Sequence, residues 1–301
     1  MADRRLQVFH AVATHLSFTR AAEALFMTQP AVTFQIRQLE DECQTRLFER
    51  RHGGVSLTGA GQLVLDYARR ILALQTEMDT RLAELTDAMR GSLQIGATQA
   101  LAGSSVPVLL ADFNARHPQV QTRLIVGNSE QLESRVRDGS LDLALLEGAP
   151  TQPGVDALPL GEDPLYLICS PDHPLAGQKA VTAKQLREYE FIAREPGSAT
   201  RQQMNAFFAA AGVAAEALKV VMEVGSLATL LALVQSGLGC AIVPRPALPD
   251  GAERRGLVAL PLKPARLRPV SLVLPQTRFR SRLIQTFIEF SQQKLRELKE
   301  R

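Results

Sequence analysis

The segment from Ser17 to Glu49 constrains the fold of this chain more than any other stretch of the sequence. A first amphipathic helix is expected before it, with apolar residues at three- and four-residue spacing: Leu6, Phe9, Val12 and Ala13. A second short helix is expected over Thr19–Leu25, with Ser17 or Thr19 as its N-cap. Because a third helix follows after a short turn, the segment predicts a helix-turn-helix.

The third helix is expected to run from its N-cap, Thr28, to about Glu42, after a turn at Phe26-Met27. Pro30 then lies in the first helical turn, where its missing N–H costs no hydrogen bond. The inner face is expected to be formed by Ala31 or Val32, Ile36 and Leu39. The outer face presents a polar and aromatic set: Gln29, Pro30, Thr33, Phe34 and Arg37.

That outer face has the chemistry of a DNA-reading helix. A helix fits the major groove, where its N-terminal side chains meet base edges. Gln29 can form two hydrogen bonds with adenine, and Arg37 can pair with guanine or a phosphate. Arg50 and Arg51 precede a Gly-Gly turn and suit contacts with the DNA backbone or the minor groove. Spacing alone leaves open a compact helical bundle with a polar face.

The run from Ser17 to Gly61 resembles the winged helix-turn-helix of LysR-type transcriptional regulators. The matching residues are Ala21-Ala22, Leu25, Gln29-Pro30-Ala31-Val32, Ile36, Leu39-Glu40, Leu47-Phe48-Glu49-Arg50, Leu57-Thr58 and Ala60-Gly61. The resemblance implies a sequence-specific regulator that binds double-stranded promoter DNA, and it leaves RNA polymerase open as a further partner. The residues expected to contact DNA are Thr19, Thr28, Gln29, Pro30, Thr33, Phe34, Arg37, Arg50 and Arg51.

Three residues depart from the family's usual pattern. Thr33 stands where Ser is common and keeps the hydroxyl, and Gln44 stands where Gly is common after the third helix. Phe34 replaces a commonly polar or basic residue. It can touch a thymine methyl group or pack against the wing, and the sequence leaves both open.

Charge adds little to the case for DNA. The net charge is only +3, and residues 1–61 hold seven Arg and no Lys against six acidic residues. The basic excess lies in residues 250–301, with twelve Lys and Arg against five acids. Affinity is therefore expected to depend on a few arginines, helix N-termini and dimer geometry rather than on a broad basic patch.

Other classes of protein find little support. The three cysteines and five histidines show no disulfide or metal spacing, so no metal and no cofactor are expected. No signal peptide and no apolar run long enough for a membrane span are found, which favours a cytoplasmic location. No nucleophile elbow, phosphate-binding loop or dinucleotide motif is found either, so no catalytic residue is assigned and an enzyme is not expected. A solute-binding protein would suit a bilobed fold, but it would need a signal peptide.

A long helix is expected over residues 58–89, ending at Arg90-Gly91-Ser92. It carries a continuous apolar stripe: Tyr67, Ile71, Leu74, Met78, Leu82, Leu85 and Met89. Such a seam needs a partner, either its own domain or a second copy. The resemblance implies an antiparallel linker-helix homodimer, and beyond it a homotetramer.

From Ser92 onward, strand-like and helical runs alternate, which predicts an α/β region with largely parallel strands. The expected strands are 93–97, 121–126, 141–146, 165–169, 190–193, 219–223, 240–243 and 270–274. The expected helices are 106–116, 129–137, 183–188, 198–211, 226–236 and 280–298. Two crossing strands near residues 158–161 and 267–269 would join two lobes into a bilobed, periplasmic-binding-protein-like fold.

The expected domains are a winged helix-turn-helix (1–58), a linker and dimerisation helix (59–90) and an effector-binding domain (91–301). Within the last, lobe I is expected to comprise 91–161 and 268–301, and lobe II 162–267.

In such sheets, ligands lie beyond the carboxyl ends of strands, at helix N-termini. The candidate ligand residues are Thr98, Gln99, Asn128, Ser129, Glu147, Arg194, Ser198, Thr200, Arg201, Gly225 and Ser226. Their hydroxyls and free N–H groups suit a small anion, although each Ser or Thr can also be a simple N-cap. The segment from Arg194 to Arg201 resembles the effector domain of LysR-type regulators of inorganic sulfur and carbon metabolism, with Ala199 at a common Gly position. The resemblance implies that a small anionic effector modulates promoter binding.

Overall fold

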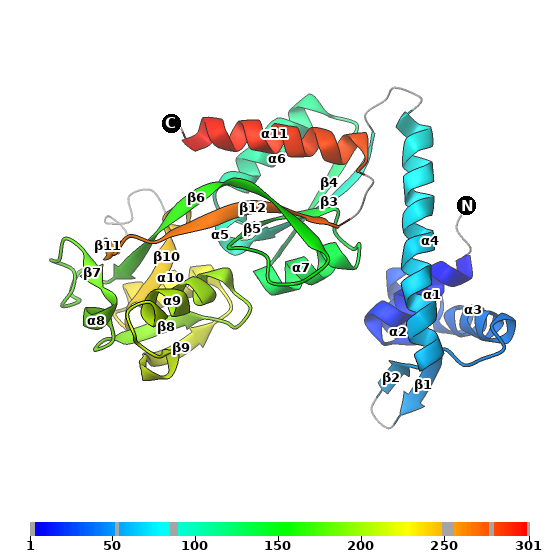
Figure 1. The fold of residues 1–301 in the computed structure, drawn as a ribbon, viewed down its shortest axis with the longest axis horizontal. Coiled ribbons are helices and arrows are strands. Elements are labelled where there is room, and N and C mark those ends of the chain that lie inside the picture. The colour runs from blue at the N-terminus through cyan, green and yellow to red at the C-terminus, as the bar shows by residue number, and fades with distance from the viewer. Residues whose placement is uncertain (1–3, 52–53, 85–89, 249–255, 277–279, 300–301) are drawn as a thin grey trace. The chain divides into compact units, whose positions relative to one another are not determined.

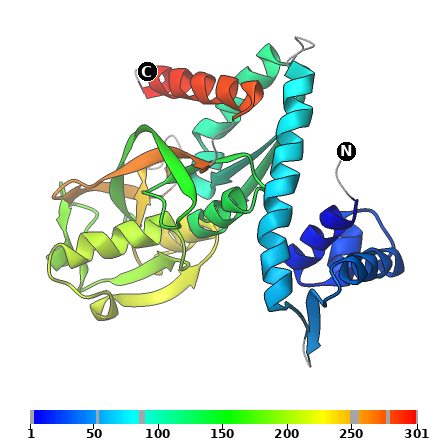
Figure 2. The same ribbon diagram turned by 45° about the vertical axis from the view of Figure 1, so that its right-hand side comes forward.

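The computed structural model describes residues 4–51, 54–84, 90–248, 256–276 and 280–299. The chain divides into two compact units, Met1–Ala88 and Met89–Arg301. The first unit contains α1 (Arg4–His15), α2 (Phe18–Ala24), α3 (Gln29–Glu42), β1 (Phe48–Arg51), β2 (Gly54–Leu57) and α4 (Gly59–Glu84), as Figure 1 shows. This is a winged helix-turn-helix followed by a long helix, which is seen unbroken in both views (Figure 2).

The three short helices pack around one apolar core, which includes Val8, Phe9, Val12, Val32, Ile36 and Leu39. Val32, and not Ala31, is the buried member of α3 near its start. The expected caps are present, because Ser17 accepts a hydrogen bond from the N–H of Arg20 and Thr28 accepts one from the N–H of Ala31. The first-turn N–H groups that a helix leaves unpaired are thus partly satisfied by these side chains.

Three non-glycine residues of this unit have a left-handed backbone: Leu16 (φ 46°), Phe26 (φ 52°) and Gln44 (φ 49°). Each lies at or just after the end of a helix. Gln44 is the position where the family commonly has Gly, which takes up this conformation without strain. Its side-chain amide donates a hydrogen bond to the carbonyl oxygen of Asp41.

The start of α4 is held against the chain that enters the wing. The hydroxyl of Thr58 accepts a hydrogen bond from the N–H of Gly61 (2.9 Å) and donates one to the carbonyl oxygen of Arg46 (2.7 Å). A Cβ atom at Gly61 would lie 2.0 Å from the carbonyl oxygen of Leu47. The packing of the long helix on the DNA-reading unit therefore requires glycine at this position.

The second unit has two lobes. Lobe I is built on β3 (Gly91–Thr98), β4 (Val120–Gly127) and β5 (Leu143–Glu147). Helices α6 (Ser105–Arg116) and α11 (Arg282–Lys299) cover one face of its sheet through a shared core, and α7 (Ser129–Arg137) covers the other. Lobe II contains β7 (Val181–Thr182), β8 (Glu190–Arg194), β9 (Lys219–Val224), β10 (Ala241–Pro244), β11 (Val258–Lys263), α8 (Ala183–Leu186), α9 (Ala199–Ala209) and α10 (Leu227–Gln235). Three short helices complete the unit: α5 (Gln99–Ala102) and the 3-10 turns Ala215–Ala217 and Arg245–Ala247.

Two long strands join the lobes, as the sequence predicts. They are β6 (Val155–Cys169) and β12 (Leu267–Pro275). β12 pairs antiparallel with residues 155–164 of β6, with a register shift between Val270 and Ser271. The strand order is β4-β3-β5-β12-β6-β11-β7, and β10 also pairs with β6. The elements expected from the sequence are present with shifted ends, whereas α5, β7, β11 and the two 3-10 turns are additional. Residues 85–89, where the long helix is expected to end, lie outside the described residues.

The expectation of largely parallel strands is wrong. The pairs β3·β4, β3·β5, β8·β9 and β7·β11 are parallel, but every pairing of β6 and β12 is antiparallel. The reason is that β6 and β12 pass between lobes in opposite directions, and strand direction leaves no trace in the spacing of apolar residues.

Replacement of Gly61 tests the close packing at the start of α4. Gly61→Ala is expected to lower the free energy of unfolding by about 2–3 kcal/mol, because the backbone of Leu47 must move. Gly59→Ala is the matched control, since a Cβ there meets nothing within 4 Å, and it should be neutral or stabilising by up to about 1 kcal/mol. Chemical denaturation followed by circular dichroism measures both; equal effects of the two substitutions would contradict this account.

Candidate DNA-reading surface and interlobe cavity

Seven of the side chains expected to contact DNA are described, and they lie on α2, on α3 and at the N-cap of α3. Thr19, Thr28, Gln29, Pro30, Phe34 and Arg37 are exposed, and Thr33 is half-buried. The amide of Gln29 donates a hydrogen bond to the hydroxyl of Thr33 (2.9 Å), which fixes both side chains at the start of α3. Arg50 and Arg51 end β1, and their side chains lie outside the described part of the structure.

Phe34 is 57% exposed on α3. A side chain packed onto the wing would be largely covered, so this exposure favours the alternative in which Phe34 is free to meet a partner. Phe26, in the turn before α3, is 98% exposed. The sequence alone does not mark Phe26 as a surface residue, since Phe is among the residue types most often buried.

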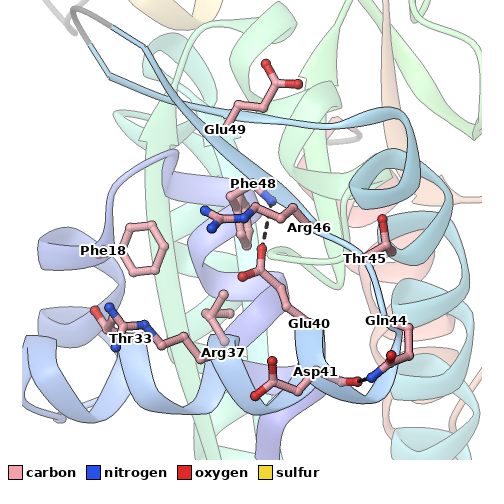
Figure 3. Close-up of a pocket in the computed structure, with 11 residues that line it drawn as sticks. Phe18, Thr33, Arg37, Glu40, Asp41, Gln44, Thr45, Arg46, Phe48 and Glu49 are labelled. Atoms are coloured by element: carbon pink, nitrogen blue, oxygen red, sulfur yellow. Dashed lines mark hydrogen bonds between the residues drawn. The ribbon is translucent and has the colours of Figure 1, made fainter.

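A concave groove of about 960 Å³ lies between α3 and β1 (Figure 3). It is lined by Phe18, Thr33, Ile36, Arg37, Glu40, Asp41, Gln44, Thr45, Arg46, Phe48 and Glu49. The carboxylate of Glu40 accepts hydrogen bonds from the N–H groups of Leu47 (2.7 Å) and Phe48 (3.2 Å). These bonds fix the first wing strand relative to the reading helix, which explains why Glu40 belongs to the motif. Arg46, which the sequence analysis did not single out, lies in the groove with Arg37.

In the second unit, a small cavity lies where the two lobes meet. Its lining is Thr98, Gln99, Ala100, Gly127, Asn128, Ser129, Glu147, Arg194, Ser198, Ala199 and Thr200. Most of the expected ligand residues are therefore brought together from both lobes. The volume is about 10 Å³, which is room for about one water molecule.

The cavity is rich in hydrogen-bonding groups that are not used elsewhere. The hydroxyl oxygens of Thr98 and Ser129 are buried and have no hydrogen-bond partner in the described structure. Ser198 is the N-cap of α9 but makes no side-chain capping bond. Asn128, in contrast, forms a complete capping box with Gln131 at the start of α7. The N-termini of α7 and α9 thus face the cavity with free hydroxyls beside them, an arrangement that suits an anion.

Three of the expected ligand residues do not line the cavity. Arg201 instead donates to the carbonyl oxygen of Arg194 (2.9 Å) and pairs with Glu223 (3.2 Å), so its guanidinium is directed to β9. Gly225 accepts a hydrogen bond from Gln99, and Ser226 caps α10 by accepting one from the N–H of Thr229. The sequence showed that these residues follow strand ends but not which partners their side chains reach.

Arg194 lines the cavity but its charge is already matched. Its guanidinium donates two hydrogen bonds to the carboxylate of Glu195, at 2.8 and 3.0 Å. An anion in the cavity would therefore depend mainly on hydroxyl and backbone N–H donors. Adjacent residues on an extended strand usually point apart, so the sequence alone does not reveal this pairing.

Gln99 joins the two lobes. Its amide donates to the carbonyl oxygen of Gly225 (2.7 Å), and its carbonyl oxygen accepts from the N–H of Leu227 (2.7 Å), the first residue of α10. A backbone bond from the N–H of Glu130 to the carbonyl oxygen of Gly197 (3.3 Å) spans the same junction. The lobes are thus closed on each other, and Gln99 acts as a bridge as well as a lining residue.

Beneath the cavity, Glu147 belongs to a buried ion cluster that the sequence analysis missed. Its carboxylate lies 3.0 Å from the guanidinium of Arg268, which is completely buried. Asp163, opposite Arg268 in the β6–β12 ladder, is 3.6 Å from the same nitrogen. Arg268 follows two other basic residues, Lys263 and Arg266, so no local pattern distinguishes it as the buried one.

The two buried cysteines, Cys169 and Cys240, do not carry reactive thiols. Burial raises the pKa of the Cys169 thiol to about 11 and that of Cys240 to about 12. Both therefore stay protonated and weakly nucleophilic at neutral pH. Within the described ranges, no His, Cys, Asp and Glu side chains gather as a metal site. None of the described helices is both long and apolar enough to cross a membrane.

Comparison with known families decides the identity. Residues 4–62 match the model of the bacterial regulatory helix-turn-helix protein of the lysR family, and residues 86–296 match the LysR substrate binding domain. The chain belongs to the LysR family. As a member, it shares a fold class of transcriptional regulators with an N-terminal winged helix-turn-helix and a bilobed α/β domain.

Among its LysR-family relatives is a "RuBisCO operon transcriptional regulator" of Allochromatium vinosum, 41% identical over 85% of this chain and 84% of that protein. Full-length CbnR, solved in complex with its target DNA, has the same fold (TM-score 0.64, 23% identity, 98% of this chain and 100% of that one). The regulatory domain of Synechocystis CcmR in complex with 2-PG matches 68% of this chain and 97% of that one (TM-score 0.63, 25% identity).

Phe34 offers a test of the reading surface. Because its side chain is exposed, Phe34→Arg should change the free energy of unfolding by less than about 1 kcal/mol. We expect it to change the order of preference among promoter sequences in a binding assay. Gln38→Arg, which adds the same charge at another exposed position of α3, should raise affinity for all sequences alike. A stability loss without any change in preference would contradict the assignment.

Proposed function

We propose that this LysR-family chain regulates transcription by binding promoter DNA, and that a small anionic metabolite between its lobes modulates this binding. The observation that carries the proposal is the interlobe cavity. Two buried hydroxyls without partners, on Thr98 and Ser129, lie with the N-termini of α7 and α9 around one space. Buried polar groups are almost always paired. The two unpaired hydroxyls therefore support a ligand whose oxygen atoms accept hydrogen bonds from them.

The names of the relatives point to an effector that is a metabolite of carbon metabolism. Several are named RuBisCO transcriptional regulators, and the CcmR domain was solved with 2-PG. We infer a small phosphorylated or carboxylated compound as the effector. The protein acts by binding in the cytoplasm rather than by catalysis, and RNA polymerase is a candidate partner at the promoter.

The cavity in its present form is too small for such a compound. Because Gln99 and the Glu130–Gly197 bond close the lobes, entry requires the lobes to move apart. The ligand would then favour one lobe arrangement over another, and only that difference in affinity can alter DNA binding.

We further propose that α4 forms an antiparallel homodimer. The apolar stripe predicted from the sequence is exposed along the described helix at Tyr67, Ile71, Leu74, Met78 and Leu82, and exposed Leu63 extends it. The last two predicted members, Leu85 and Met89, lie outside the described residues. Isolated exposed apolar residues need no explanation, but a contiguous seam on a long helix indicates a partner. Val108 on α6 and Val221 and Met222 on β9 are also exposed and support a second pairing surface, as a homotetramer requires.

The ligand site is tested by thermal shift of the full-length protein with phosphate, sulfate and small phosphorylated carboxylates. A ligand at 100 times its Kd should stabilise the folded protein by about 2.7 kcal/mol. Thr98→Ala should remove most of this stabilisation. Thr122→Ala, which deletes a lobe I hydroxyl bonded to Asn114 outside the cavity lining, should retain it.

The same ligand should change the affinity of the protein for its own upstream DNA. No preference for that DNA over random DNA as salt rises would refute the proposed function.

The dimer is tested by Leu74→Glu. Leu74 is 64% exposed in the middle of the stripe, so a charge there should raise the dimer dissociation constant at least tenfold without unfolding the unit. Gln62→Glu adds the same charge off the stripe and should leave the dimer intact. Sedimentation velocity over a range of concentrations measures both, and identical assembly of the two variants would exclude a stripe-mediated dimer.

A further inference from the structure

The ion cluster formed by Glu147, Arg268 and Asp163 affects which ligands the cavity accepts. This inference rests on the proposed function. Glu147 is the one carboxylate among the residues that line the cavity, and it is almost fully buried. As half of an ion pair with Arg268, it presents acceptor oxygens and no donor. An anionic group of the ligand would be repelled at this wall of the cavity.

Arg268 divides its charge between two carboxylates. The same guanidinium nitrogen lies 3.0 Å from Glu147 and 3.6 Å from Asp163. No solvent reaches the guanidinium, and its nitrogens form no hydrogen bond in the described structure. The cavity is therefore polarised, with donors at the helix N-termini and Thr98 and Ser129, and an acceptor at Glu147.

We propose that Glu147 selects ligands that carry a hydroxyl group beside their anionic group. The anion lies at the N-termini of α7 and α9, and the hydroxyl donates a hydrogen bond to the Glu147 carboxylate. A hydrogen bond to a charged acceptor in a buried site is stronger than a neutral one. A ligand without the hydroxyl leaves the carboxylate buried and without this donor, which is the situation that gives strong discrimination between close analogues.

Arg268 is a positioning residue in this arrangement. It holds Glu147 at the end of β5, where the N–H of Gly148 also donates to the carbonyl oxygen of Pro269 (2.8 Å). Removal of the Glu147 charge leaves the Arg268 guanidinium 3.6 Å from the Asp163 carboxylate, so Glu147→Met keeps a countercharge beside the buried Arg268.

The test compares glycerol 3-phosphate with propyl phosphate, which share a phosphate ester and a three-carbon chain and differ in hydroxyl groups. Inorganic phosphate reports on the anion end alone. In titration calorimetry with the full-length protein, glycerol 3-phosphate should bind at least tenfold more tightly than propyl phosphate. In Glu147→Met the ratio should fall below twofold. The control is Glu133→Gln, which removes another buried carboxylate of lobe I that lies outside the cavity lining and accepts bonds from Thr151 and Gln152; it should keep the wild-type ratio.

Each outcome separates this inference from the function on which it rests. Equal binding of the two esters by the wild-type protein, with phosphate also bound, would overturn the role of Glu147 and leave the anion site intact. Failure of all three compounds to bind would remove the anion site, and this inference with it. If Glu147→Met does not fold, Glu147→Gln keeps the shape and loses the charge, and should reduce the ratio at least threefold; an unchanged ratio would overturn the proposal.

Discussion

The antiparallel pairing of β6 with β12 is the constraint on which the second unit depends. β12 pairs with residues 155–164 of β6, with a register shift between Val270 and Ser271, and the rest of β6 pairs with β10 and β11 of lobe II. Because β12 also pairs with β5, the end of β5 and its Glu147 are fixed relative to the crossing. The position of the cavity between the lobes follows from this one ladder, and the helices that face it are attached on either side.

The same ladder buries a charge cluster, which stability alone does not account for. Replacement of a buried ion pair by apolar residues is often neutral or stabilising, whereas removal of one partner costs about 3–5 kcal/mol. Arg268 on β12 contacts Asp163 on β6 and Glu147 at the end of β5, and Glu147 also lines the cavity. The first unit, by contrast, is held by contacts between residues that are close in the sequence. Gly61 packs against the backbone of Leu47, and the Glu40 carboxylate accepts a hydrogen bond from the N–H of Leu47.

The sequence predicted much of the fold because its helices and strands are marked by period, caps and breakers. Thr28 and Pro30 define the start of α3, and the rule that ligand groups follow strand ends found Thr98, Ser129 and Ser198. Prediction from the sequence failed where the position of a side chain depends on a partner that is distant in the sequence. Arg201 was misplaced because its guanidinium reaches Glu223 on another strand, and Arg268 was overlooked because its carboxylates lie far away in sequence. Strand direction was also misjudged, since alternation is the same in parallel and antiparallel strands.

The bridge made by Gln99 has a consequence for the sensitivity of any response. Its side-chain amide forms hydrogen bonds with backbone groups of lobe II, and these bonds must break before the lobes can open. The apparent affinity of an incoming molecule is its intrinsic affinity reduced by the fraction of protein that is open. The concentration threshold of the switch is thus set partly by an amide that need not touch the ligand. The ligand concentration at which the protein responds can therefore be changed at Gln99, at the lobe junction, and the choice of ligand can be changed separately at Glu147, at the cavity wall.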